Sequence, residues 1–201
     1  MWRYSFQKEI NLEIYKMIVS TKGIVLRTTK YGESSVIVSV FTRECGLKSY
    51  IQNGIRKGRS QGKANYFSIG SILLLEVYNR ENKSLERIKE LTFSYVFTDI
   101  TTDIVKSSIL YFVVELLNIC CEENHIDTNL FDFVETYLLD LDKTEAVAAD
   151  LPIHFMLELS HYLGFKPIGI QSIEEKFFSL EEGFFTAEEG VNTLNHEMSV
   201  S

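Results

Sequence analysis

Two neighbouring segments, KGIVLRTTK at residues 22–30 and SVIVSVFTR at residues 35–43, are rich in β-branched residues and flank the turn signal YGE at residues 31–33. β-branched residues favour strands, whereas glycine and short polar residues favour turns. Three further segments are also rich in β-branched and aromatic residues: LKSYIQN at 47–53, SILLLEVY at 71–78 and SLERIKELTFSYVF at 84–97. Five strands at this spacing predict a small closed or nearly closed barrel. The last segment also fits helical spacing, so the five-strand count depends on it.

The hydrophobic period changes after about residue 100. Apolar residues recur every three or four positions over residues 104–117, 127–142 and 145–163, which predicts three amphipathic helices. The segment TTD at 101–103 can cap the first helix, and the third starts or kinks near Pro152 and ends at Gly164. Residues 176–186 (KFFSLEEGFFT) predict a short hairpin. Residues 36–41 are apolar on both faces of their strand, so we expect the helical part to cover one side of the barrel. The predicted fold class is α+β, a β-barrel followed by an α-helical domain.

Charge is divided unevenly along the chain. The total is −8, but residues 17–100 carry thirteen Lys and Arg against seven Asp and Glu, while residues 101–201 carry four against nineteen. Such a division favours two modules with different partners, because a basic module attracts a polyanion and an acidic module repels it. The alternative is that helical surfaces are simply rich in Asp and Glu.

The sequence contains no complete catalytic motif. Residues 58–64 (GRSQGKA) resemble a phosphate-binding loop, but only three residues separate the glycines and Ala64 stands where a magnesium-binding Ser or Thr is needed. The histidines form no HExxH pair, and three cysteines, two of them adjacent, supply neither a disulfide framework nor a four-cysteine zinc site. We therefore expect no enzyme activity, no metal and no cofactor. No apolar run is long enough to cross a bilayer and residues 1–16 lack a signal-peptide pattern, so we expect a cytoplasmic protein without membrane contact.

The segment GIRKGRSQGK at residues 54–63 is the strongest binding signal. Its glycines allow close backbone approach, and its cations can contact phosphates. The first-choice phosphate contacts are Arg56, Lys57, Arg59 and Lys63, and the weaker choices are Lys22, Arg27, Lys30, Arg43 and Lys48. Small barrels commonly bind single strands and stack bases on aromatic rings. Tyr31, Tyr50 and Tyr66 are candidates for stacking, and the alternative for each is a place in the barrel core or at its rim.

The blocks TKGIVLRTTKYGES (21–34), SVIVSVFTRECGL (35–47), NGIRKGRSQGKANYFSIGSILLLEVY (53–78) and HFMLELSHYLGFKP (154–167) resemble, in order and spacing, the RecO family of bacterial recombination mediators. The resemblance runs from about residue 18 to residue 167. It implies an OB-fold barrel followed by a helical domain. It also implies binding of single- and double-stranded DNA, strand annealing, and work with RecR to load RecA onto strands coated by single-strand-binding protein (SSB).

The chain departs from the family pattern in three places. Many members carry a four-cysteine zinc site after the Gly-Phe-x-Pro turn, whereas this chain has no cysteine beyond Cys121. The family usually continues with further helices, so we expect a helical domain shortened at its C-terminus. Residues 1–16 precede the usual start, so we expect an N-terminal extension at 1–16, an OB-fold DNA-binding domain at 17–100 and a helical domain at 101–201.

The leading hypothesis is a non-catalytic DNA-binding mediator of recombination and DNA repair, associated with the nucleoid. It would anneal complementary strands and help to load RecA onto SSB-coated single-stranded DNA. One alternative is a protein-interaction scaffold that does not bind nucleic acid, and another is an OB-fold RNA-binding protein. Electrophoretic shifts with labelled DNA and RNA at two salt concentrations would separate the three.

We predict that the purified protein holds no structural zinc, because its cysteines and histidines cannot converge on four tetrahedral positions. Apolar packing in the 176–186 hairpin, through Phe177, Phe178, Phe184 and Phe185, would take the place of the metal. Elemental analysis after purification without a chelator should therefore find far less than one zinc per chain. A stoichiometric zinc content would contradict this prediction.

Overall fold

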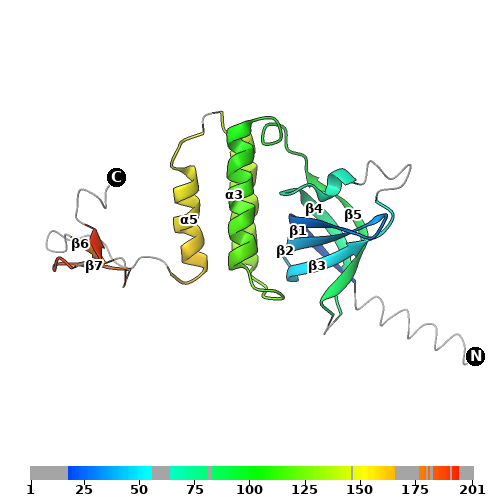
Figure 1. The fold of residues 1–201 in the computed structure, drawn as a ribbon, viewed down its shortest axis with the longest axis horizontal. Helices are drawn as coiled ribbons and strands as arrows, with labels where there is room; N and C mark the ends of the chain where they lie inside the picture. The colour runs from blue at the N-terminus through cyan, green and yellow to red at the C-terminus, as the bar shows by residue number, and fades with distance from the viewer. Residues whose placement is uncertain are drawn as a thin grey trace, which may run out of the picture. The chain divides into compact units, whose positions relative to one another are not determined.

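A computed structural model describes residues 18–55, 64–80, 83–145, 147–165, 177–179, 181, 183–190 and 192–194. Within them lie a five-stranded barrel, three α-helices and a small three-stranded sheet (Figure 1). The barrel strands are β1 (Ile18–Tyr31), β2 (Ser35–Thr42), β3 (Gly46–Gln52), β4 (Ile72–Tyr78) and β5 (Leu85–Tyr95), with the short helix η2 (Asn65–Phe67) between β3 and β4. The later elements are α3 (Ile104–Cys120), α4 (Thr128–Lys143), α5 (Leu151–Tyr162), β6 (Phe177–Ser179), β7 (Phe185–Thr186) and β8 (Thr193–Leu194).

The barrel closes in the order β1-β2-β3-β5-β4, and every pairing is antiparallel except that of β3 with β5. A closed five-stranded barrel of this kind is an OB-fold barrel, so the predicted α+β class is confirmed. The ambiguous segment at 84–97 forms strand β5. Closure accounts for this outcome, because without β5 the edges of β3 and β4 would leave backbone hydrogen-bonding groups unpaired.

Alternate residues of the strands fill the inside of the barrel. Val25 lies opposite Val40, Val38 lies opposite Tyr50, and all four side chains are fully buried. A bulge follows Val25 in β1. Bulges bend a strand, and here the first half of β1 pairs with β4 while the second half pairs with β2. Strand β1 is therefore the element that closes the barrel.

Helices α3 and α4 cover the outer side of β1 and β2, as the apolar pattern of β2 predicts. Phe41 on β2 is buried, and its ring centroid lies 5.5 Å from that of Phe131 on α4. The Asn118 side chain on α3 donates a hydrogen bond to the Leu26 carbonyl at 3.4 Å. At the turn before β3, a Cβ on Gly46 would clash with the backbone of the loop between α3 and α4. Glycine at this turn lets that loop lie against the barrel.

The joint between the barrel and its helices is built around the buried carboxylate of Asp142, in α4. It accepts hydrogen bonds of 2.9–3.2 Å from the Tyr95 hydroxyl and from the backbone N–H groups of Thr98, Asp99 and Ile100. Burial by itself raises the pKa of Asp142, but these hydrogen bonds outweigh it and lower the pKa to about 2. The buried Lys106 ammonium on α3 donates to the Asp142 carbonyl at 2.9 Å and contacts the Asp99 carboxylate at 3.2 Å. The segment after β5 is thus tied to both helices.

Residues up to Ala149 form one compact unit, and those from Asp150 onward form another. In the second unit α5 carries Pro152 in its first turn, where proline is tolerated. The chain leaves this helix through Gly164, which has a φ of 80°. The barrel, α3 and α4 belong to the first unit, so the domain boundary near residue 100 stays a prediction. No helix in the described part of the chain combines the length and apolar character needed to cross a membrane.

The predicted hairpin near residues 176–186 is confirmed. Strand β6 pairs antiparallel with β7, with Phe177 opposite Thr186 and Phe178 opposite Phe185. The rings of Phe178 and Phe185 make an edge contact with centroids 5.1 Å apart. Strand β8 pairs with the other side of β6, which adds a strand that the sequence did not predict.

Replacing Asp142 by Asn should lower the free energy of unfolding by about 2–4 kcal/mol, because an amide presents one acceptor oxygen to donors that now share two. Urea denaturation at neutral pH measures this difference. Because the pKa of Asp142 is lowered from 3.8 to about 2 in the folded protein, the extra stability of the parent chain exists above about pH 4. It should be lost as the pH falls towards 2. Asp140→Asn, an exposed change on the same helix, should cost less than about 0.5 kcal/mol, and equal losses in both variants would contradict the prediction.

Candidate nucleic-acid interface

The first-choice basic side chains, Arg56, Lys57, Arg59 and Lys63, lie outside the described residues, so their contact with DNA stays a prediction. Both ends of their loop are fixed to the barrel. The Ile55 amide donates to the Ser34 carbonyl at 2.9 Å, and the Ile55 side chain is buried. At the other end the Thr28 hydroxyl donates to the Phe67 carbonyl at 2.8 Å. The described residues on both sides of this segment therefore lie at one end of the barrel, beside the turn between β1 and β2.

Two weaker choices, Lys22 and Arg43, are bound to acidic residues of α4. Lys22 Nζ lies 2.7 and 2.9 Å from the carboxylate oxygens of Glu135. The Arg43 guanidinium donates to both oxygens of Asp132 at 2.7 and 2.8 Å, which holds the pKa of Asp132 below its ordinary value. A phosphate would have to compete with these carboxylates. Both cations attach α4 to the barrel, and their contact with DNA stays a prediction.

Arg27 and Lys30 are exposed on β1, and neither forms an ion pair within the described residues. Arg27 begins one of two rows of residues that cross the outer surface of neighbouring strands. The rows are Arg27, Ser39 and Ser49, and then Thr29, Ile37, Ile51 and Arg87. Neither row contains an acidic residue. OB-fold barrels bind oligonucleotides on the face of their second and third strands, which is the surface that these rows occupy.

Lys48 lies in an open pocket of about 700 Å³ beside that surface. Its Nζ donates to the Asn79 side-chain oxygen at 2.5 Å. The connection between β4 and β5 contributes two more cations to the pocket wall, Arg80 and Lys83. The described lining residues include no carboxylate: Cys45, Lys48, Asn79, Arg80, Lys83, Ser84, Asn124 and Ile126. The pocket can therefore accept an anionic group. OB-folds use this same connection for ligand binding.

The buried carboxylate of Glu86 positions one cation of this pocket. Glu86 accepts hydrogen bonds of 2.7–3.2 Å from the Arg80 guanidinium and one of 3.1 Å from the Arg80 amide. Burial by itself raises the pKa of Glu86, but the bonds from Arg80 outweigh it and lower the pKa. Glu86 is therefore ionised at neutral pH and neutralises much of the Arg80 charge. Lys48 and Lys83 remain the cations most available to a phosphate.

Sequence reasoning did not single out Arg80, Lys83 or Arg87. A signal was present, because NRENK at residues 79–83 connects the fourth and fifth strands, a connection that OB-folds use for binding. Arg87 could not be assigned to a face while its segment fitted both a helix and a strand. We name the group Lys48, Arg80, Lys83 and Arg87, which lies where β3 meets β5, the basic seam.

Of the three tyrosines considered for base stacking, Tyr50 is fully buried, so the alternative of a place in the barrel core is confirmed for this residue. Its place opposite Val38 turns the ring into the barrel. Tyr66 stacks on Phe93 with ring centroids 4.4 Å apart, which is a contact at the barrel rim. Tyr31, the last residue of β1, is 53% exposed, so its ring is accessible.

The three cysteines have limited exposure to solvent. Cys45 is buried, and Cys120 and Cys121 are half-buried at the end of α3. Burial raises the pKa of Cys45, and it raises the pKa of Cys121 to about 12, so both thiols are protonated at neutral pH. Within the ranges that the structure describes, no three His, Cys, Asp or Glu side chains gather in a way that could hold a metal ion.

Two family models match the chain. The model for the N-terminal part of recombination protein O matches residues 17–97, and the model for its C-terminal part matches residues 101–192. The chain is 36% identical to the DNA repair protein RecO of Flavobacterium psychrophilum and to that of Flavobacterium johnsoniae, over 163 residues in each. These matches cover 81% of this chain and 68% of each relative. The DNA repair protein RecO of Bacteroides fragilis is 32% identical over 151 residues, which are 75% of this chain and 62% of that relative.

Replacing Lys22 and Arg43 together by Gln should lower the free energy of unfolding by about 0.5–2 kcal/mol, because both side chains hold α4 carboxylates at partly exposed positions. Urea denaturation measures the loss, and salt should reduce it because the pairs are partly screened. The matched variant Arg27→Gln/Lys30→Gln removes the same charge from the same barrel. It should change stability by less than about 0.5 kcal/mol. A larger loss in the matched variant would contradict the structural role of Lys22 and Arg43.

Proposed function

Because the chain belongs to the RecO family of DNA repair proteins, we propose that it acts as a recombination mediator that binds DNA through its barrel. In this proposal the protein binds single- and double-stranded DNA, anneals complementary strands and helps to load RecA onto SSB-coated single strands. RecR and SSB are its proposed protein partners. It acts without catalysing a reaction, and its proposed place in the cell is the nucleoid.

The main support for the proposal is the basic seam, which lies beside two rows of outward-facing residues that contain no acidic residue. Lys48 and Lys83 line one pocket, and Arg87 extends the row that crosses β1, β2 and β3. Phosphates lie at regular intervals along a strand, so cations distributed along such a path can contact several of them. The described residues that lead into the segment at 56–63 lie at the far end of the same surface, where the Ile55 amide donates to the Ser34 carbonyl. Cations of the seam and of the rows therefore lie on neighbouring strands.

The composition of this surface favours binding without sequence preference. Serine, threonine and isoleucine side chains occupy the rows between Arg27 and Arg87. A surface that contacts backbone phosphates holds strands of any sequence. Two such strands bound near each other have their mutual repulsion reduced by the protein cations. This supports annealing as the proposed activity, since annealing requires screening of two backbones rather than readout of their bases.

The acidic helices direct DNA to one side of the barrel. Residues 101–149, which include α3 and α4, carry two basic and ten acidic residues, and α4 already engages Lys22 and Arg43. A phosphate backbone is repelled from that side and attracted to the basic seam. The resemblance to the RecO family implies that SSB docks on the helical domain through its acidic tail, and this tail would meet the same repulsion there. We therefore expect the SSB interaction to be weak, strongly dependent on salt, or supported by the basic barrel.

The triple change Lys48→Gln/Lys83→Gln/Arg87→Gln should weaken binding of labelled oligothymidine and flatten the log–log dependence of affinity on salt by up to about 2 units. The expected slope is roughly −0.7 per phosphate contact on a single strand. Replacing Arg56, Lys57, Arg59 and Lys63 together by Gln should flatten it by up to about 3 units. Fluorescence anisotropy at several salt concentrations measures both effects.

The control Lys143→Gln removes an exposed cation at the end of α4 and should leave affinity and slope unchanged. If both multiple variants keep the parent affinity and slope, DNA does not bind this surface. Equal affinity for single-stranded RNA and DNA would favour the RNA-binding alternative. No binding of either nucleic acid by the parent chain would favour a protein-interaction scaffold.

A further inference from the structure

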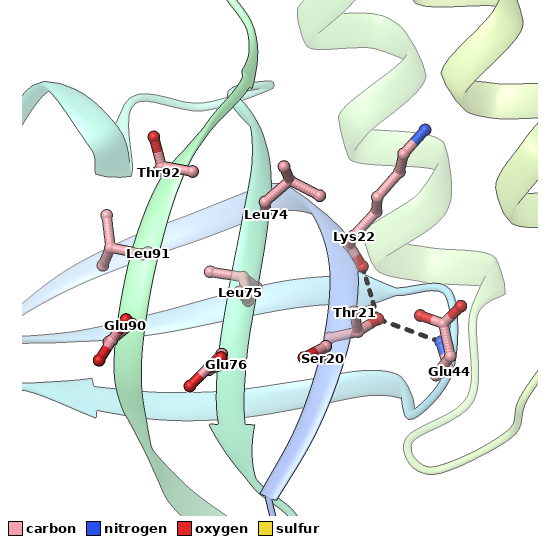
Figure 2. A pocket seen from close by; sticks show the side chains of 10 residues that line it. All are labelled: Ser20, Thr21, Lys22, Glu44, Leu74, Leu75, Glu76, Glu90, Leu91 and Thr92. Carbon is pink, nitrogen blue, oxygen red and sulfur yellow. Dashed lines mark hydrogen bonds between the residues drawn. The ribbon is translucent and has the colours of Figure 1, made fainter.

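The barrel carries a second recessed surface, centred on β4, and its chemistry is opposite to that of the basic seam. Figure 2 shows this groove between β1, β4 and β5, with the turn after β2 at one end. It encloses about 520 Å³. Three leucines and three glutamates contribute to its wall: Leu74, Leu75, Leu91, Glu44, Glu76 and Glu90. Lys22 and small hydroxyl side chains complete the lining. Strands β2 and β3 are not neighbours of β4, so the groove and the oligonucleotide surface lie on different sides of the barrel.

Two glutamates in this groove face each other directly. Glu76 on β4 is the cross-strand partner of Glu90 on β5, and Figure 2 shows the two side chains next to each other on the same face. Like charges directly opposite in a sheet are destabilising. Lys89 contacts Glu76 at 2.7 Å, but Glu90 has no cationic partner within the described residues. The fold therefore carries uncompensated negative charge at this point.

The turn at the end of the groove contains a buried carboxylate oxygen that has no hydrogen-bond donor. Glu44 Oε1 accepts a hydrogen bond from Arg43 at 3.1 Å, whereas Glu44 Oε2 is buried and has no hydrogen-bond partner. A buried acceptor without a donor costs free energy. Natural sequences depart from local rules mainly at functional sites, so two departures in one groove point to a ligand that supplies the missing positive charge and donors.

The floor of the groove adds an apolar contact. Leu74 is 45% exposed and lies in the row next to the glutamate pair, between Lys22 on β1 and Thr92 on β5. A nucleic acid does not fit this chemistry, because Glu76 and Glu90 repel phosphates. A peptide that combines basic and apolar side chains fits it, because its cations meet the carboxylates while an apolar side chain covers Leu74.

We propose that this groove docks a basic segment of a partner protein. A Lys or Arg of that segment lies between Glu76 and Glu90, and a neighbouring apolar side chain packs on Leu74. This contact is separate from the basic seam, so the protein can hold DNA and the partner at the same time. The groove proposal can also fail while DNA binding by the barrel stands.

The test uses the full chain and a fluorescein-labelled peptide of alternating lysine and leucine, with a glutamate–leucine peptide as the charge control. Glu90→Gln is the principal variant because it removes the unpaired charge and leaves the contact between Glu76 and Lys89 in place. Glu115→Gln, an exposed change on α3, is the matched control for net charge. Anisotropy measures binding at low and physiological salt, and thermal unfolding without peptide measures stability.

We expect the parent chain and Glu115→Gln to bind the lysine peptide equally and Glu90→Gln to bind it about twofold to fivefold more weakly. Without peptide, Glu90→Gln should have a Tm about 1–3 °C above that of Glu115→Gln, because the opposed charges are removed. Equal binding by all three chains, no binding of the lysine peptide, or no rise in Tm would each overturn the proposal. Binding that emerges only after residues 1–16 are removed would also overturn it, since the groove would then be filled by this chain itself.

Discussion

The carboxylate of Asp142 accepts three consecutive backbone N–H groups and the Tyr95 hydroxyl where the barrel ends and the helices begin. The carboxylate satisfies the backbone donors of this turn, including that of the buried Ile100, and so stabilises the turn. Lys106 binds the same turn and the end of α4, which makes α3, α4 and the last barrel strand a single arrangement. The cover over Phe41 and the positions of the acidic residues of α4 depend on this joint.

The position of α4 determines which cations of the barrel are paired with carboxylates and which stay exposed. Asp132 and Glu135 on α4 pair with Arg43 and Lys22, so a phosphate would have to displace a carboxylate to contact either cation. Exposed cations of the described barrel include Arg27 and Lys30 on β1, Arg87 on β5 and Lys83 in the connection between β4 and β5. In a family of DNA repair proteins, this sorting gives a polyanion one side of the barrel to approach.

The barrel wall then offers two surfaces of opposite charge. The basic seam lies where β3 meets β5, while the opposed Glu76 and Glu90 lie between β4 and β5. Closed barrels have no strand edges to offer a partner, so recognition has to use side chains on the wall and the loops at the ends. Under our two proposals, these surfaces hold a nucleic acid and a protein segment without requiring them to compete.

The alternation of β-branched residues and the change of period near residue 100 determined the barrel and the three helices, because these patterns depend only on neighbouring residues. The N-cap at Asp103 and the end of the third helix at Gly164 could be predicted from the sequence for the same reason. The nature of residues 84–97 was decided by barrel closure, and closure also turned Tyr50 inward. The pairing of Lys22 with Glu135, of Arg43 with Asp132 and of Glu76 with Glu90 was decided by tertiary structure. Strand register and helix packing set which distant charges meet, and a linear pattern carries no information about either.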